Sequence, residues 1–215
     1  MFIYDEIGFF GVEASAFVRD FRAINAAEIT VHVNSPGGDV FDGIAIHNAL
    51  RDHPAEVTVV IDALAASIAS VIAMAGDRIV MAQHSTMMIH EAFGFALGDA
   101  ADMRRQADFL DRSSATLADI YAGRAGGTSA EWRARMEAET WFSDAEAVEA
   151  GLADEVATAA PETAAAKFDL SIYRHAPGAK HSEPEPDPES DDPPVLPDWR
   201  RSAVEQHAAA IGAQR

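Results

Sequence analysis

The sequence predicts an α/β fold, a layered arrangement of repeated strand–helix units. Residues Ile29–Asn34 alternate apolar and polar side chains, as a half-buried strand does, and the turn-forming run Ser35–Gly38 ends them. Val57–Ile61 is a β-branched run typical of a buried strand, and the alanine-rich stretch Leu64–Ala75 is typical of a buried helix. Because strands and helices alternate, we expect a parallel or mixed sheet covered by helices.

Capping and turn residues delimit the helices that follow these two strands. Asp39 caps a predicted helix that runs to about Asp52. A second helix is expected after Ser67, with Ala65-Ala66-Ser67 at the turn before it and Gly76 at its end. Each of the first two predicted strands is therefore followed by a helix.

Two short strands and three helices are expected after Gly76. Arg78–Ala82 and Thr86–His90 have the pattern of short strands, and Asp99–Tyr121 fits a long helix that Gly126-Gly127 breaks. In a capping box, a hydroxyl and a carboxylate near the helix start satisfy backbone N–H groups. Two such boxes mark two further helices: Thr128 with Glu131, and Ser143 with Glu146.

The composition changes near residue 175. Six of the ten prolines lie in Glu183–Pro197, where they alternate with acidic residues, and such a segment cannot bury enough apolar surface to fold. We therefore predict a folded domain over residues 1–174 and an acidic, proline-rich, disordered tail over residues 175–215. Within that tail, Trp199–Ile211 is either a short terminal helix or a frayed end.

The charge and composition exclude several classes of function. The chain of 215 residues has a net charge of −19, so we expect phosphates of nucleic acids and anionic lipids to repel it. It has no cysteine, which excludes a thiolate nucleophile or a thiolate metal site. Its two lysines, Lys167 and Lys180, come too late for a P-loop or a serine–lysine dyad in the first three quarters. No histidine pair has metal-ligand spacing with a carboxylate nearby, so we expect no metal. We expect no cofactor either.

The sequence also indicates where the protein acts. Asp5 and Glu6 stand where a signal peptide needs basic residues, so we expect no export signal. Val57–Gly76 is the one long apolar stretch, and a strand followed by a helix explains it better than a membrane span. A cytoplasmic protein without a membrane partner is therefore expected.

Ser67 is the first candidate for chemistry, because it lies where a buried strand gives way to a helix. A tight turn there exposes the hydroxyl, and the helix N-terminus offers N–H groups to a developing oxyanion. Small neighbours such as Ala66 let a substrate backbone approach. By position alone an ordinary helix N-cap is the commoner role. Ser70, one helical turn later, is the nearest rival nucleophile.

Three further segments carry polar groups suited to acyl-transfer chemistry. The glycine pair in Asn34–Gly38 can present N–H groups to an anion or a carbonyl, or can simply form a strand–helix turn. His90 ends an apolar strand and is a candidate general base, with His84 as its closest rival and a structural histidine as the alternative. Glu139 or Glu137 could orient an imidazole, although a solvated acid is the commoner role at such a site.

In this order and spacing, these segments resemble the ClpP family of serine peptidases, over roughly residues 2 to 156. Asn34–Gly38 looks like the family's turn with the oxyanion-hole glycine, and Ala65-Ala66-Ser67 looks like its nucleophile segment. Met88-Ile89-His90 looks like its histidine segment, and Phe142–Asp154 matches the segment after its acid.

The resemblance implies a role for each of these residues. Ser67 would be the nucleophile and His90 the base, and Glu139 stands where the family usually has aspartate. Glu137 is the alternative acid, and a dyad without an acid also fits. The other roles are these: the N–H groups of Gly38 and Ile68 form the oxyanion hole, and Gly37 and Ala66 lie along the substrate.

The resemblance also implies an architecture and an assembly. The fold would be the ClpP/crotonase-like layered fold of repeated strand–helix units, with Asp99–Tyr121 as a protruding handle helix and Gly94–Gly98 as the strand beside it. The chains would form a ring-shaped homo-oligomer, and two such rings would stack through this helix.

Within the family, the pattern Glu139-Thr140-Trp141 and a first strand as early as Ile3-Tyr4-Asp5 are more like the head-maturation proteases of tailed phages and prophages. Those enzymes cleave scaffold and capsid proteins during prohead assembly. We therefore expect an ATP-independent serine endopeptidase that acts on such proteins in the bacterial host cytoplasm, without an unfoldase partner. The rival interpretations are a crotonase-like acyl-CoA enzyme and a catalytically inactive, ring-forming structural protein.

Overall fold

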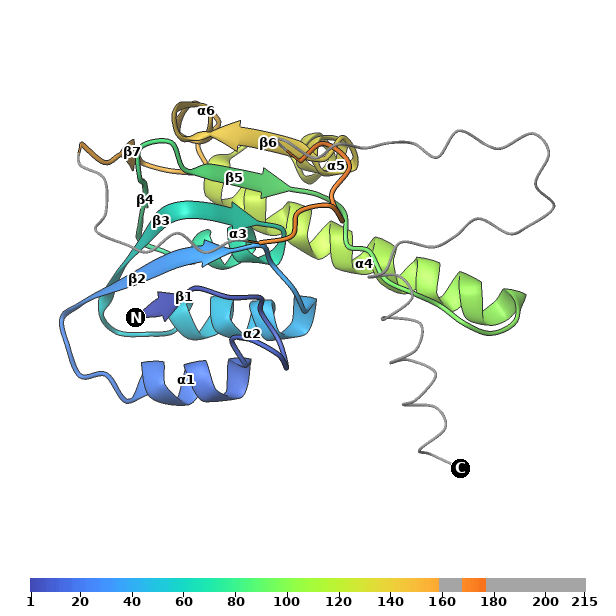
Figure 1. Cartoon of the computed structure of the whole chain (residues 1–215), viewed down its shortest axis with the longest axis horizontal. Helices are drawn as coiled ribbons and strands as arrows, with labels where there is room; N and C mark the ends of the chain where they lie inside the picture. The colour runs from blue at the N-terminus through green and yellow to red at the C-terminus, as the bar shows by residue number, and fades with distance from the viewer. Residues whose placement is uncertain (159–167, 177–215) are drawn as a thin grey trace.

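A computed structural model describes residues 1–158 and 168–176 of the chain. Strands and helices alternate through the first half, and helices dominate the second (Figure 1). The strands are β1 (Phe2–Ile3), β2 (Glu28–Ser35), β3 (Glu56–Ala66), β4 (Arg78–Met81), β5 (Thr86–Ile89), β6 (Thr140–Ser143) and β7 (Glu155–Val156). The helices are α1 (Ala14–Arg22), α2 (Val40–Arg51), α3 (Ile68–Ala73), α4 (Ala100–Ala125), α5 (Ser129–Glu137) and α6 (Asp144–Glu149).

The described strands form one mixed sheet in which β3 has two sets of neighbours. Strands β1, β2, β3, β4 and β7 pair in that order, all parallel. The first part of β3 pairs with β4 over Thr58–Ile61, whereas its last residues, Leu64–Ala66, pair with β5. β5 in turn pairs antiparallel with β6. The long strand β3 therefore delivers the chain to one end of the sheet, beside the end of β5.

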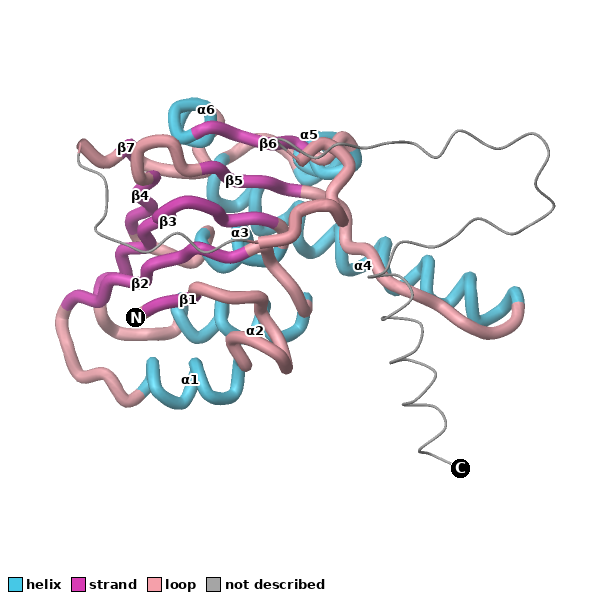
Figure 2. The backbone as a smooth tube through the Cα atoms, viewed as in Figure 1, coloured by secondary structure: helices cyan, strands magenta, loops and turns pink. Residues whose placement is uncertain are grey.

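The core lies between the sheet and the helices behind it. Figure 2 shows the strands side by side, with α3 behind them and α1 and α2 along one side. Phe21 of α1, Ile46 of α2 and Ile72 of α3 are all fully buried in the same apolar cluster as Val31 and Val59 of the sheet. Burial of each such side chain contributes about 1.5–3 kcal/mol, so this layer fixes the sheet on which the polar residues are displayed.

Helix α4 is long and projects beyond the body of the domain (Figure 1). A capping box of Asp99 with Asp102 starts it, and Gly126, with φ of 77°, follows its last residue. Its second half is buried at Leu117 and Tyr121, whereas Met103 in its first half is exposed. In the projecting half, Phe109 contacts Phe41 with their ring centroids 5.8 Å apart, whereas Met103 stays exposed.

Several expected elements are confirmed. Asp39 caps α2 by accepting hydrogen bonds from two backbone N–H groups, and both capping boxes of the second half are formed. The mixed α/β fold with a parallel sheet and a projecting helix is the expected one.

Three expectations on boundaries are corrected. β3 does not end at Ile61 but continues to Ala66, because β5 gives its last residues a second pairing partner, so only Ser67 is left between strand and helix. Residues 94–98 form no strand in the described chain, since no other strand edge lies beside them to pair with. α4 extends past Tyr121 to Ala125.

The predicted domain boundary falls inside a described segment. Residues 168–176 pack against the domain across the expected border at 174 and 175, and Ala176 is buried. The predicted disorder of the tail from residue 177 onward, and the segment Trp199–Ile211, lie outside the described residues.

Candidate active site

Ser67 is the single residue between strand β3 and helix α3. Its φ of 54° is positive, a conformation that residues other than glycine rarely adopt. Its N–H donates to the carbonyl of Met88, 2.9 Å away on β5, which holds the turn in place. Its hydroxyl makes no capping bond to α3, so Ser67 does not act as an ordinary N-cap. The strained turn instead directs the hydroxyl away from the helix.

His90 directly follows β5 and faces Ser67. The pairing of Ala66 with Met88 brings the ends of β3 and β5 together, and the Nε2 atom of His90 lies 2.7 Å from Ser67 Oγ. Burial lowers the pKa of His90 to about 4, although the negative charges of Glu139 and Glu91 act in the opposite direction. The imidazole is therefore neutral at pH 7 and can accept a proton.

The glycine turn after β2 packs directly against Ser67. Gly37 has φ of 101°, and a Cβ atom added to it would lie 2.6 Å from the Cβ of Ser67. Gly38 has φ of 146°, and an added Cβ would lie 2.0 Å from the carbonyl oxygen of Ile7. Both positions therefore require glycine, one for contact with Ser67 and one for contact with the backbone.

Two backbone N–H groups lie beside Ser67, those of Gly38 and Ile68. Gly38 forms a parallel bridge with Ile7, whose N–H donates to Gly37 at 2.7 Å and whose carbonyl accepts from Asp39 at 2.8 Å. In such a bridge the enclosed residue turns its own N–H to the other side, away from Ile7. Ile68 is the first residue of α3, where N–H groups precede the helical hydrogen-bond ladder.

Glu139 lies between α5 and β6 and is buried, with 8% of its surface exposed. Its carboxylate accepts hydrogen bonds from the N–H of Arg174 at 2.7 Å, the N–H of His175 at 2.5 Å and the indole of Trp141 at 3.2 Å. Burial by itself raises the pKa of Glu139, but these donors together bring the pKa below its usual value. Among the described residues, no hydrogen bond joins Glu139 to His90.

Of the rival residues, Ser70 and His84 line neither cavity beside Ser67 and His90, whereas Glu137 lines one of them. The Ser70 hydroxyl is buried, donates to the carbonyl of Ser67 at 2.6 Å and lies 2.7 Å from the hydroxyl of Tyr121, so it belongs to the core. His84 is exposed in the turn between β4 and β5. Glu137 is exposed and lines the same cavity as His90.

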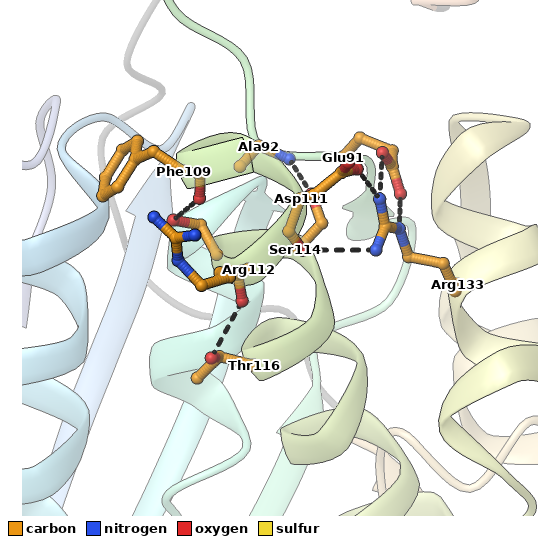
Figure 3. A network of polar contacts seen from close by, with 9 residues as sticks. Glu91, Ala92, Phe109, Asp111, Arg112, Ser114, Thr116 and Arg133 are labelled. Atoms are coloured by element: carbon orange, nitrogen blue, oxygen red, sulfur yellow. Dashed lines mark hydrogen bonds and ion pairs between the residues drawn. The ribbon is translucent and has the colours of Figure 1, made fainter. Parts of the chain in front are cut away.

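An ion-pair network fixes the chain just after His90 (Figure 3). Arg133 of α5 binds both carboxylate oxygens of Glu91, and it also donates to Asp111 of α4 at 2.8 Å. The N–H of Ala92 donates to the hydroxyl of Ser114, also on α4, at 2.9 Å. Helices α4 and α5 thus hold the segment that follows β5 and His90; we call these contacts the clamp.

Sequence reasoning missed the residue that fills the cleft, Tyr173. Its hydroxyl donates to the carbonyl of Pro36, and its ring lies edge-on against His90 with the ring centroids 5.1 Å apart. Together with Ser67 and Gly38 it lines a cavity of about 400 Å³. The apolar alternation of Phe168, Leu170 and Ile172 just before it was the available signal of an extended, packed segment.

The described residues contain no group of three or more side chains arranged to hold a metal ion. Within the same residues, none of the helices has both the length and the apolar character needed to cross a membrane.

Comparison with known proteins identifies the family. The model of the Clp protease family matches residues 21–160. The ATP-dependent Clp protease proteolytic subunit of Chlorella vulgaris is 34% identical over 140 residues, which cover 62% of this chain and 70% of the relative. That of Bacteroides fragilis is 32% identical over 131 residues, covering 60% of this chain and 63% of the relative. The ATP-dependent Clp protease proteolytic subunit 3 of Rhodococcus jostii is 32% identical over 150 residues, which cover 66% of this chain and 74% of the relative. A match over most of the described chain shows that this protein belongs to the Clp protease family.

Proposed function

We propose that the protein is a serine endopeptidase that hydrolyses peptide bonds through an acyl-enzyme, with Ser67 as nucleophile and His90 as general base. The observation that carries this proposal is the distance of 2.7 Å between His90 Nε2 and Ser67 Oγ, in a cleft where the imidazole is neutral. A base within hydrogen-bond reach of a serine on a strained strand-to-helix turn is the arrangement that nucleophilic catalysis needs.

The reaction follows from the positions of these groups. The Ser67 oxygen attacks the substrate carbonyl carbon while His90 Nε2 takes the hydroxyl proton. The N–H groups of Gly38 and Ile68 bind the oxyanion, and one such donor is typically worth a factor of about 100–1,000 in kcat. The intermediate collapses as the C–N bond breaks and His90 gives its proton to the leaving amine. Water, deprotonated by His90, then attacks the ester, which releases the acid and restores Ser67.

Glu139 is proposed as the third member of this site. Its charge already acts on His90, since it opposes the lowering of the His90 pKa. Its carboxylate is bonded to the N–H groups of Arg174 and His175 instead of the imidazole. We propose that it orients His90 when these two donors move away. Glu137 would take the role only if loss of the Glu139 carboxylate left activity intact.

A serine-reactive fluorophosphonate tests the nucleophile. Incubation with the native protein, followed by digestion and mass spectrometry, is expected to place the adduct on Ser67 and to give none in Ser67→Ala. An adduct on Ser70 would move the assignment there. No adduct on a folded protein would favour the inactive structural alternative.

An acyl-CoA enzyme is the rival reaction class, and the charges at the site disfavour it. Among the described residues that line the two cavities beside His90 and Ser67, Arg174 is the one Lys or Arg side chain. The acidic residues around the same cavities are Glu6, Glu91, Glu137, Glu139 and Asp169. The phosphates of CoA require cationic partners. We expect no binding of CoA in calorimetry, and micromolar binding would favour the rival.

We propose an assembly of several copies, in keeping with the ring expected from the resemblance. The segment before α4 exposes Phe93 at 51%, Phe95 at 39% and Leu97 at 69%, beside the exposed Met103 of α4. On a soluble domain, a row of exposed large apolar side chains is typical of a protein–protein interface. Native mass spectrometry is expected to give a multimer, and Leu97→Asp is expected to dissociate it.

We also propose that hydrolysis needs no ATP and that the substrates are phage scaffold and capsid proteins. The support is the resemblance of Glu139-Thr140-Trp141 to head-maturation proteases. Co-expression with neighbouring capsid and scaffold genes, without any ATPase, is expected to give shortened products with the wild type and full-length products with Ser67→Ala. Full-length products with both would contradict the proposal on substrates.

A further inference from the structure

A short segment of the chain, residues 168–176, covers the cleft at Ser67; we call it the strap. Figure 1 shows it in orange across the ends of the central strands. Tyr173 and Ala176 of the strap are buried in one apolar cluster with Leu64 and Ala66 of β3 and Met88 of β5. These residues lie in the last part of the strands that lead to Ser67 and His90. The strap therefore packs on the part of the sheet that presents the two proposed catalytic residues.

Tyr173 places a side chain where a substrate must lie. Its hydroxyl donates to the carbonyl of Pro36, in the glycine turn that faces Ser67. Burial raises the pKa of the Tyr173 phenol, against a smaller opposite effect of its hydrogen bond with the Ser67 side chain. Its ring covers His90, with 5.1 Å between the ring centroids. The phenol therefore narrows the approach to Ser67, which lines a cavity of about 400 Å³ together with Tyr173.

The strap also holds the proposed acid. The N–H groups of Arg174 and His175 donate to the two carboxylate oxygens of Glu139. Because these bonds use both oxygens, the carboxylate is satisfied without the imidazole, and His90 is left without the orienting partner that a triad needs. One segment thus covers the nucleophile and binds the acid.

The strap is not placed as a substrate. The group that faces Ser67 is a phenol, not a peptide carbonyl. Within the described residues, no carbonyl of the strap accepts a hydrogen bond from Gly38 or Ile68. The one backbone bond inside the strap runs from the N–H of Tyr173 to the carbonyl of Leu170, a turn that keeps the chain off the nucleophile.

We propose that the strap is an intramolecular inhibitor, which lowers the activity by keeping the cleft of most molecules closed until residues 168–176 leave it. The proposal rests on the peptidase function proposed above. Displacement of Tyr173 opens the space beside Ser67, and withdrawal of Arg174 and His175 frees Glu139 to turn toward His90. The fraction of molecules with an open cleft then sets the observed rate.

Access to the nucleophile can be measured without any peptidase activity. The chain has no cysteine, so Ser67→Cys creates a single thiol in the cleft of the full-length protein. We expect iodoacetamide to alkylate this thiol at least about tenfold faster when Tyr173→Ala is added. Ser171→Ala, which removes an exposed hydroxyl of the same strap, is the matched control and should leave the rate unchanged.

Peptide hydrolysis is measured in parallel on proteins that keep Ser67. Tyr173→Ala should be faster than wild type by at least about tenfold, and Ser171→Ala should equal wild type. If Tyr173→Ala does not fold, as judged by circular dichroism, Tyr173→Phe replaces it. That variant keeps the ring and loses the bond to Pro36, so we expect a smaller rise of about threefold or more.

The two measurements separate the two proposals. A rise in both rates supports the strap and the peptidase. Faster alkylation with no hydrolysis in any variant supports the cover over Ser67 and overturns the peptidase function. Hydrolysis by the wild type, with neither rate changed by Tyr173→Ala, overturns the strap and leaves the peptidase function in place.

Discussion

Gly37 lies directly against Ser67: a Cβ atom at Gly37 would come within 2.6 Å of the serine Cβ and 2.9 Å of the carbonyl of Ala66. Both neighbours are fixed, one by the strained turn and one by the strand, so neither can move aside cheaply. The glycine turn can therefore lie this close to Ser67 only because Gly37 has no side chain.

The first prediction concerns this contact. Gly37→Ala should reduce kcat/KM by about 100-fold or more, because displacement of the turn moves the neighbouring Gly38 N–H away from the oxyanion. The measurement is peptide hydrolysis, with thermal melting to verify folding. Gly123→Ala is the matched control, since a Cβ there meets nothing within 4 Å. In helix α4 it should stabilise the protein by about 0.5–1 kcal/mol and leave activity unchanged. Equal activity of both variants would contradict the role of the turn.

The second prediction is the titration of His90. Because burial lowers its pKa to about 4, its NMR Hε1 signal should titrate near pH 4, and His90→Gln should remove that signal. A free histidine titrates near about 6.5, so the unfolded chain binds the proton first. Unfolding free energy should therefore fall as pH drops from about 6.5 toward 4, and His90→Gln should lack this part of the loss. A midpoint near 6.5 in the native protein would be the contrary result.

Tyr173→Ala should raise this midpoint, because the Tyr173 ring is part of what buries His90. Ser171→Ala should not change it. A rise of the His90 titration midpoint in Tyr173→Ala alone indicates that Tyr173 covers His90. General destabilisation would instead lower the melting temperature of either variant and leave the His90 midpoint unchanged.

The third prediction separates the two candidate acids. Glu139→Gln keeps the size of the side chain but replaces an acceptor oxygen by an NH2 group that faces a donor, which costs about 1–3 kcal/mol of unfolding free energy. Loss of the charge should also reduce kcat by up to about 10,000-fold. Glu137→Gln, at an exposed position, should change neither. Denaturant unfolding and hydrolysis of both variants provide the test, and the reverse ranking would assign the role to Glu137.

The fourth prediction concerns Arg133, whose ion pairs join α5 to Glu91 and to α4. Arg133→Met should destabilise the protein by about 1.5–3 kcal/mol, since Glu91 then loses a partly buried charged partner. Activity should fall as well, because Glu91 follows His90. Arg78→Met breaks a half-exposed pair with Glu155 and should cost at most about 1 kcal/mol. Equal costs in urea unfolding would argue against the clamp.

The local features of the site could be predicted from the sequence. The sequence predicts that Ser67 follows a buried strand and that His90 ends another, and the structure brings their side chains together beside the paired ends of β3 and β5. Glycine was expected after β2, and its close approach to Ser67 explains why only glycine fits. These features depend on a few residues on either side of each strand end.

The contacts of Glu139 and Tyr173 could not be predicted in the same way. Tyr173 meets Pro36 across 137 positions of sequence, and no periodicity or capping rule specifies such a pair. A carboxylate at position 139 was expected to face His90, but the strap offers two N–H donors that satisfy it better. The end of β3 was misplaced for a related reason, because the partner strand that extends it comes from a later part of the chain.

The central claim is that Ser67 attacks the peptide bond. The most direct measurement is hydrolysis of a peptide library by the wild type and by Ser67→Ala, both in the Tyr173→Ala background and both verified as folded by circular dichroism. The account predicts cleavage by the protein that keeps Ser67 and a loss of about 10,000-fold or more when it is replaced. Cleavage at comparable rates by both proteins would contradict it.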